Sequence, residues 1–358
     1  MTRAQKIELI QLLQEKQRRK LTQKLFSYYP DEGPLRRDLY KKHMSFFEAG
    51  ESYRERLFMA ANRVGKTEGA GGLELTYHLT GLYPKWWRGK RFNRPITAWA
   101  AGDSGKTVRE IIQAKLLGPI HDKGSGLIPK DFIIRTTSKA GVSDAIDTVQ
   151  VKHVSGGIST LVFKSYDQRR ISFQGSEQDV IWLDEEPPIE VYEECVMRTM
   201  TNDGIIMLTF TPLMGMSETV LSFLPGGNIE ERSTGPKHVV IASWDDVPHL
   251  SEKAKGDMLA SIQPFQRDAR SKGIPQLGSG AIYPVPESEI IVDDMPIPDH
   301  FLEFMVWMLD GIKLLFHGLH GIKIMTSYMS PLSIIEVRQS PQFMPKQLRH
   351  VALGYLVL

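Results

Sequence analysis

Between residues 56 and 244, short apolar segments alternate with stretches whose apolar residues recur at helical spacing. Strands that alternate with helices favour βαβ units and a mostly parallel sheet. The segment 180–183 is apolar at every position, as expected of a strand covered on both faces. The pattern therefore predicts an α/β domain over residues 51–272. Its predicted strands are 56–60, 96–101, 179–184, 204–210 and 238–244, and its predicted helices are 68–79, 108–117, 189–200 and 217–224.

The pattern differs at both ends of this domain and in one stretch within it. Helical spacing predicts an amphipathic helix over residues 4–27 and a shorter one over 36–49, so that residues 1–50 form a helical lead-in. The stretch 121–170 lacks the strand–helix rhythm, and we expect antiparallel strands there. The Gly- and Pro-rich segment 273–286 predicts a linker.

Composition excludes several classes of protein. Hydrophobic residues make up 41% and charged residues 24% of the 358, with a net charge of +2, so a DNA-binding surface would have to be a local patch. With Cys195 as the single cysteine, an intrachain disulfide and a cysteine-rich zinc site are excluded. No segment approaches the roughly 20 apolar residues that span a bilayer, and the N-terminus lacks a signal-peptide core. We expect a soluble protein of a reducing cytoplasm, with no membrane contact.

Two segments match most of a phosphate-binding loop, AANRVGKT at 60–67 and AAGDSGKT at 100–107. Each follows a predicted strand and precedes a predicted helix, which is where backbone N–H groups can bind phosphate. In the first segment, Gly65 lets the backbone approach the ligand, Lys66 neutralises phosphate charge and Thr67 ligates Mg²⁺. Local chemistry does not choose between the two segments, although an early strand favours the first.

The segment VIWLDEE at 180–186 supplies the acidic half of such a site. Its strand would bring Asp184 to the edge of the sheet, where the carboxylate can hold Mg²⁺. Glu185 can then polarise the attacking water as a general base. The next predicted strand ends in Thr209 and Thr211, a polar pair suited to sensing the γ-phosphate.

A basic segment interleaved with two tryptophans follows the predicted helix 68–79. Such a patch can bind phosphate and stack bases, but a helix end with packed tryptophans is the more frequent arrangement. Its members are Lys85, Trp86, Trp87, Arg88, Lys90 and Arg91.

This order of motifs resembles the large terminase subunits of tailed, headful-packaging enterobacterial phages. The similarity covers residues 25–308. It is carried by SFFEAGESYRERLFMAANRVGKT, YHLTGLYP, WWRGKRF, FQGSEQDVIWLDEEPP, LTFTPLMGMS and ARSKGIPQLGSGAIYPVPE.

The resemblance implies a P-loop NTPase that uses ATP and Mg²⁺, and it favours the first phosphate loop. Walker B then falls on 180–184, with Glu185 as the catalytic carboxylate, and the coupling motif falls on 209–212. Arg63 becomes a candidate charge-stabilising arginine, and His43 stands where relatives often carry an adenine-reading glutamine. The implied Walker A residues are Ala60, Ala61, Asn62, Arg63, Val64, Gly65, Lys66 and Thr67.

The resemblance further implies a motor that drives double-stranded viral DNA into a procapsid. The implied partners are the portal protein and a small terminase subunit, and the implied assembly is a homo-oligomeric ring in the cytoplasm of the bacterial host. Two alternatives remain: a prophage remnant that only binds nucleotide, and a helicase-like P-loop ATPase. The latter needs a second RecA-like domain, and no motif of one is visible after residue 275.

Relatives also carry an RNase H-like nuclease whose metal ions are held by several acidic residues. Here Glu336 is the only acidic residue in 311–358. A two-metal nuclease needs several carboxylates. We therefore expect 273–308 to be a linker with an incomplete nuclease remnant, 309–358 to be an aberrant tail, and endonuclease activity to be lost.

A frameshift near residue 307 would explain this tail, because a shifted frame can encode a segment that resembles the first nuclease strands. Sequencing the gene through codons 300–358 should show that alternative frame. A codon path with no family-like alternative would contradict the hypothesis.

Overall fold

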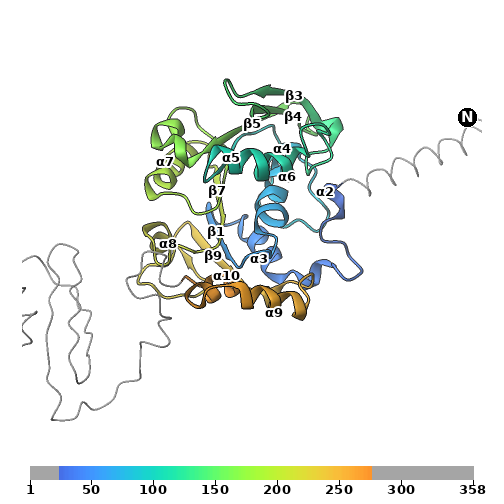
Figure 1. The fold of residues 1–358 in the computed structure, drawn as a ribbon. Helices are drawn as coiled ribbons and strands as arrows, with labels where there is room; N and C mark the ends of the chain where they lie inside the picture. Colours follow the sequence, from blue (N-terminus) through green and yellow to red (C-terminus); the bar gives the residue numbers. More distant parts are fainter. Residues whose placement is uncertain (1–23, 276–358) are drawn as a thin grey trace, which may run out of the picture. The chain divides into compact units, whose positions relative to one another are not determined.

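One nine-stranded sheet organises residues 24–275, the part of the chain that the computed structural model describes (Figure 1). The strand order is β3-β4-β5-β2-β6-β7-β1-β9-β8. All five strands expected from the sequence are present, and the predicted α/β class is confirmed. The strands are β1 (Glu55–Ala60), β2 (Thr97–Gly102), β3 (Ile133–Ser138), β4 (Ile146–Lys152), β5 (Ile158–Ser165), β6 (Val180–Asp184), β7 (Ile205–Phe210), β8 (Ser233–Thr234) and β9 (Lys237–Ala242).

The six strands from β5 to β9 in the middle of this order pair in parallel, and the edges of the sheet are antiparallel. Strands β3 and β4 extend the sheet beyond β5, which confirms the antiparallel stretch expected within 121–170. Because parallel strands share one direction, the carboxyl ends of β1, β6 and β7 meet at the same edge. Ligands of open α/β sheets bind at that edge.

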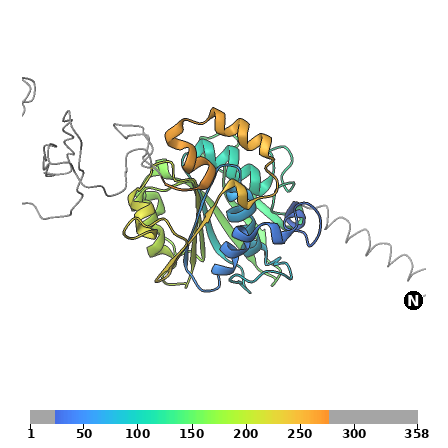
Figure 2. The same cartoon turned by 90° about the horizontal axis from the view of Figure 1, so that it is seen from below.

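Helices cover both faces of the sheet (Figure 2). The α-helices are α2 (Lys24–Ser27), α3 (Lys41–Ala49), α4 (Leu73–Thr80), α5 (Gly105–Thr107), α6 (Ala114–Leu117), α7 (Ile189–Thr199), α8 (Glu218–Phe223), α9 (Glu252–Ser261) and α10 (Arg267–Lys272). Two π-helical segments, η2 (Lys66–Gly72) and η3 (Val108–Gln113), precede α4 and α6. The 3₁₀ turns are η1 (Arg37–Leu39), η4 (Lys130–Phe132), η5 (Tyr166–Gln168), η6 (Arg170–Phe173), η7 (Trp244–Asp246) and η8 (Pro264–Gln266).

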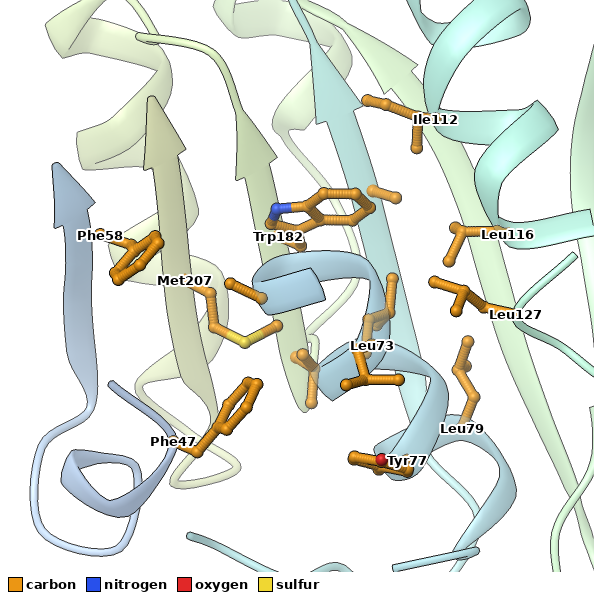
Figure 3. Packing of buried hydrophobic residues seen from close by; sticks show 14 of the residues in the cluster. Phe47, Phe58, Leu73, Tyr77, Leu79, Ile112, Leu116, Leu127, Trp182 and Met207 are labelled. Carbon is orange, nitrogen blue, oxygen red and sulfur yellow. The ribbon is translucent and has the colours of Figure 1, made fainter. Parts of the chain in front are cut away.

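Alternate residues of the central strands point into two separate cores. Phe58, Trp182 and Met207 pack with α3, η2 and α4 on one face (Figure 3). Their neighbours in sequence, such as Ile181 and Leu208, pack with α7 and α8 on the other face. A strand covered on both faces must be apolar at successive positions, which is the physical reason for the continuous apolar run in β6.

A glycine allows the helix after the first phosphate loop to lie close against the sheet. A Cβ placed on Gly71 would stand 2.1 Å from Nε1 of Trp182, a distance that real Cβ atoms do not show. Gly71 has no side chain, so Trp182 fits directly beneath η2. This contact fixes the height of the helix above β6.

A buried ion pair joins β1 to α4. Arg56 makes two hydrogen bonds to the carboxylate of Glu74, at 2.6 and 3.1 Å, and donates a third to the Phe46 carbonyl. His78 lies 3.1 Å from the same carboxylate, and the side chains of Arg56, Glu74 and His78 have no exposed surface. Burial raises the pKa of Glu74, but the charge of Arg56 and the hydrogen bonds of His78 and Arg56 together outweigh burial and leave the pKa below its usual value.

Some expectations are corrected or lie outside the described range. The helix predicted over 36–49 is divided, because Tyr40 leaves the helical conformation between η1 and α3. Most of the helix predicted over 4–27, the linker after 275, the nuclease remnant and the tail lie outside the described residues. Within 24–275, the helices are too short or too polar to cross a membrane.

Substituting Glu74→Ala should lower the free energy of unfolding by about 3–5 kcal/mol, because it leaves the Arg56 charge buried without its partner. Chemical denaturation would measure the loss. The double variant Arg56→Met, Glu74→Leu removes both charges and should be closer to the wild type. A double variant less stable than Glu74→Ala would contradict this account of the pair.

Candidate nucleotide site

The first phosphate loop joins β1 to η2 and is shaped by two residues in the left-handed region. Arg63 has a φ of 62° and Gly65 a φ of 92°. Gly65 also accepts hydrogen bonds from the N–H groups of Gly69 and Ala70, at 2.7 and 3.1 Å, so the loop turns directly into the helix. This is the strand–loop–helix geometry that presents backbone N–H groups to an anion.

The three segments expected to form the site meet at the carboxyl edge of the sheet. Oδ1 of Asp184 accepts hydrogen bonds from the hydroxyls of Thr67, at 3.0 Å, and Thr209, at 2.8 Å. The indole N–H of Trp182 donates to the hydroxyl of Thr209 at 2.8 Å. The phosphate loop, the acidic strand and the strand after it are therefore joined through one carboxylate oxygen.

Glu185 lies beside Lys66, with Oε1 at 3.9 Å from Nζ. Its side chain is 41% exposed, whereas that of Lys66 is 10% exposed. The exposed carboxylate can accept a hydrogen bond from a water molecule, and the ammonium beside it can contact phosphate oxygens. A general base must lie within hydrogen-bond reach of the proton that it accepts, and an exposed carboxylate can be reached by water.

Burial, and after it the negative charge of Glu185, raise the pKa of Asp184 to about 7, against the opposing effects of the Thr209 hydroxyl and the charge of Lys66. A divalent cation would favour the ionised carboxylate. The hydroxyl of Thr67 and the carboxylate of Asp184 are oxygen donors, which is the set that Mg²⁺ prefers. The residues at this position therefore fit the ion expected from the sequence.

Thr211, the second threonine of the motif at 209–212, lies directly after β7 and contacts the beginning of the phosphate loop. Its hydroxyl donates to the carbonyl of Ala60 at 2.7 Å and lies 3.0 Å from Oδ1 of Asn62. Thr209 therefore contacts the acidic strand, and Thr211 contacts the phosphate loop.

The C-terminal part of the described chain also holds this loop, a role for which the sequence carries no motif. Asn62 donates its N–H to the Arg270 carbonyl at 2.8 Å and accepts at its own carbonyl from the Trp244 indole, also at 2.8 Å. The Nε2 atom of His249 lies 2.9 Å from the carbonyl of Arg63. Each of these hydrogen bonds uses a backbone group of the loop, which every residue type carries, so the residue types of the loop give no signal of them.

His43 lies behind the loop. It is fully buried, its ring packs against Tyr29, Tyr40 and Phe58, and Nε2 is 3.6 Å from the position of a Cβ on Gly65. Burial lowers the pKa of His43 to about 3. With no exposed atom in this conformation, the ring could read adenine only if the loop moved, and that role stays a prediction.

In the second phosphate-loop segment, 100–107, side chains of this chain accept hydrogen bonds from the N–H groups at the helix N-terminus. The N–H of Gly105 donates to Asp167 at 3.1 Å, and the N–H of Thr107 donates to the Ser104 hydroxyl at 3.2 Å. A carboxylate of the chain therefore already accepts a hydrogen bond from one of the amides that a phosphate would use. Lys106 is exposed.

The tryptophans of the basic segment are packed rather than presented to solvent. Trp87 is buried against Phe47 and Tyr77 and donates its indole N–H to the Lys90 carbonyl at 3.1 Å. Lys90 pairs with Asp203 at 2.9 Å. This is the packed helix end that the sequence favoured.

Comparison with known proteins identifies the family. Residues 57–290 match the family described as "Terminase large subunit, T4likevirus-type, N-terminal". The large terminase subunit of Salmonella phage P22 is 36% identical over 317 residues, which is 83% of this chain and 60% of that protein. That of Enterobacteria phage LP7 is 24% identical over 328 residues, which is 83% of this chain and 62% of that protein. The chain spans about three fifths of the length of these relatives.

Two solved structures also match. The large terminase ATPase domain of Thermus phage P74-26 matches with a TM-score of 0.46 and 17% identity, over 65% of this chain and 94% of that one. The large terminase of a thermophilic bacteriophage, in complex with ADP, matches with a TM-score of 0.47 and 12% identity, over 66% of this chain and 52% of that one. The match over residues 57–290, which contains Lys66, Asp184 and Glu185, shows that this chain belongs to the terminase large subunit family.

Proposed function

We propose that this chain is a Mg²⁺-dependent ATPase whose hydrolysis of ATP drives double-stranded viral DNA into a procapsid. The observation that carries the proposal is that two pairs of side chains meet at the carboxyl edge of the sheet. Nζ of Lys66 lies 3.9 Å from Oε1 of Glu185, and the Thr67 hydroxyl lies 3.0 Å from Oδ1 of Asp184. Membership of the terminase large subunit family supports the coupling of this site to DNA packaging.

The loop 60–67 would hold the phosphates through its backbone N–H groups, and Lys66 would neutralise charge on the β- and γ-phosphate oxygens. Thr67 and Asp184 would hold Mg²⁺, which neutralises phosphate charge when bound. Arg63, whose side chain is exposed at the turn of the loop, can reach outward to charge that develops on the transferred phosphoryl group.

Glu185 would accept the proton of the attacking water, since its carboxylate is half exposed and lies beside Lys66. Thr209 and Thr211 would couple the loss of the γ-phosphate to motion. The support for this role is that the first bonds to Asp184 and the second to the Ala60 carbonyl, so one strand contacts both halves of the site.

The remaining assignments rest on the family. We propose that the portal protein and a small terminase subunit are partners, and that the working assembly is a homo-oligomeric ring in the host cytoplasm. We also propose that the chain does not cut DNA, because 311–358 contains one acidic residue, Glu336, where a two-metal nuclease needs several.

Substituting Lys66→Ala should lower the rate of ATP turnover by about a hundredfold or more, because it removes a preorganised positive charge at the phosphates. Lys106→Ala is the matched control from the second loop, and it should stay within about twofold of wild type because the side chain is exposed. A phosphate-release assay measures both variants. Loss of turnover in Lys106→Ala alone would overturn the assignment.

Affinity for Mg²⁺-ADP should rise as pH increases from 6 to 8, by about tenfold, because Asp184 with a pKa of about 7 is mostly protonated at the lower pH and must ionise to hold the cation. Calorimetric titration at several pH values measures this. Asp184→Asn should bind weakly with a flatter profile, and the ratio of the two proteins removes the ionisation of the nucleotide itself. Parallel profiles would contradict the role of Asp184.

A further inference from the structure

Glu185, the proposed general base, has an unusual backbone conformation. Glu185 has a φ of 62°, in the left-handed region that side chains other than glycine seldom adopt. Such conformations persist only when surrounding contacts hold them. Because φ sets the direction of the side chain, whatever holds this backbone also aims the carboxylate.

Two hydrogen-bonded groups hold the Glu185 backbone. Its N–H donates to the Thr209 carbonyl at 3.0 Å, which continues the pairing of β6 with β7. The hydroxyl of Tyr166 lies 3.1 Å from the Glu185 carbonyl and 3.0 Å from the Asp184 carbonyl, and donates to both. One phenol therefore fixes the two consecutive carbonyls that flank the left-handed turn.

Tyr166 is a protonated donor in the core. Its side chain is buried against Phe173, and burial raises the pKa of the phenol well above its usual value, as do the nearby negative charges of Asp184 and Glu185. Because the phenol stays neutral, it keeps the proton that it shares between the carbonyls of Asp184 and Glu185.

The turn that carries Tyr166 is anchored to the second phosphate-loop pattern. Tyr166 directly follows β5, and β2 lies between β5 and β6. Strand β2 ends at Gly102, where a Cβ would lie 3.6 Å from the Asp184 carbonyl. The next residue after Tyr166, Asp167, accepts from the Gly105 N–H at 3.1 Å and from the Ser165 hydroxyl.

We propose that Tyr166 is a positioning residue for hydrolysis, which locks the Asp184–Glu185 backbone so that the Glu185 carboxylate faces the attacking water. The loop 103–107 acts as the anchor of the turn that carries Tyr166, rather than as a nucleotide site. This inference deepens the proposed function and rests on it.

The decisive variant is Tyr166→Phe, which removes one oxygen and keeps the ring. Tyr192→Phe is the matched control, because its hydroxyl is also buried and donates to a carboxylate, that of Glu55 at the opposite end of β1 from the phosphate loop. For each protein, ATP turnover gives kcat and KM, titration gives the affinity for ADP, and thermal melting reports the fold. Hydrogen–deuterium exchange of the peptide over 180–188 reports the local backbone directly.

For Tyr166→Phe we expect kcat to fall by about tenfold, with KM and ADP affinity within about twofold and a melting temperature close to that of Tyr192→Phe. Exchange at 185–186 should become faster in Tyr166→Phe alone. Unchanged kcat with unchanged exchange would overturn the proposal, as would a parallel loss of kcat, ADP affinity and melting temperature. If the wild-type chain does not hydrolyse ATP, the proposed function fails, and the exchange measurement still decides whether the phenol holds this backbone.

Discussion

The arrangement of the whole site depends on one buried carboxylate. Asp184 ends the central strand β6, has almost no exposed surface, and accepts hydrogen bonds from Thr67 on one side and Thr209 on the other. A carboxylate in such a place is stable only when donors or a cation surround it. The strand order must therefore keep the phosphate loop, β6 and β7 next to one another, and the sheet order β6-β7-β1 does so.

The packing beneath the Asp184 carboxylate also helps to hold the phosphate loop, β6 and β7 together. Trp182 contacts η2 where Gly71 leaves room for its ring, and it donates its indole N–H to Thr209. One side chain thus sets the distance of the phosphate-loop helix from the sheet and orients the hydroxyl that bonds Asp184. A change in this core would be transmitted to the oxygens of Thr67 and Asp184 without touching them, since close-packed interiors transmit displacement.

The loops at 60–67 and 100–107 have similar sequences but different surroundings at the N-terminus of the helix that follows each. At residues 60–67 the surrounding strands bring Asp184 and Glu185, whose carboxylates contact the side chains of Thr67 and Lys66 rather than the loop amides. At 100–107 the neighbouring strand β5 brings Asp167, whose carboxylate binds the first amide itself. The same strand–loop–helix sequence therefore meets the acidic strand in one environment and is capped by a carboxylate of the chain in the other.

By itself the sequence determined the α/β class, the five parallel core strands and the motifs that end at the carboxyl edge, because side-chain period and strand-end chemistry are local properties. It also determined Lys66, Thr67, Asp184 and Glu185 as candidates, since their types follow from the chemistry of phosphate and Mg²⁺. Only the tertiary structure decided which loop meets the acidic strand, that His43 is buried behind the loop, and that Tyr166 reaches the Glu185 carbonyl. Those contacts join residues far apart in the chain, and the bond of Tyr166 ends on a backbone carbonyl, a group that every residue type shares, so the local pattern of side chains does not encode them.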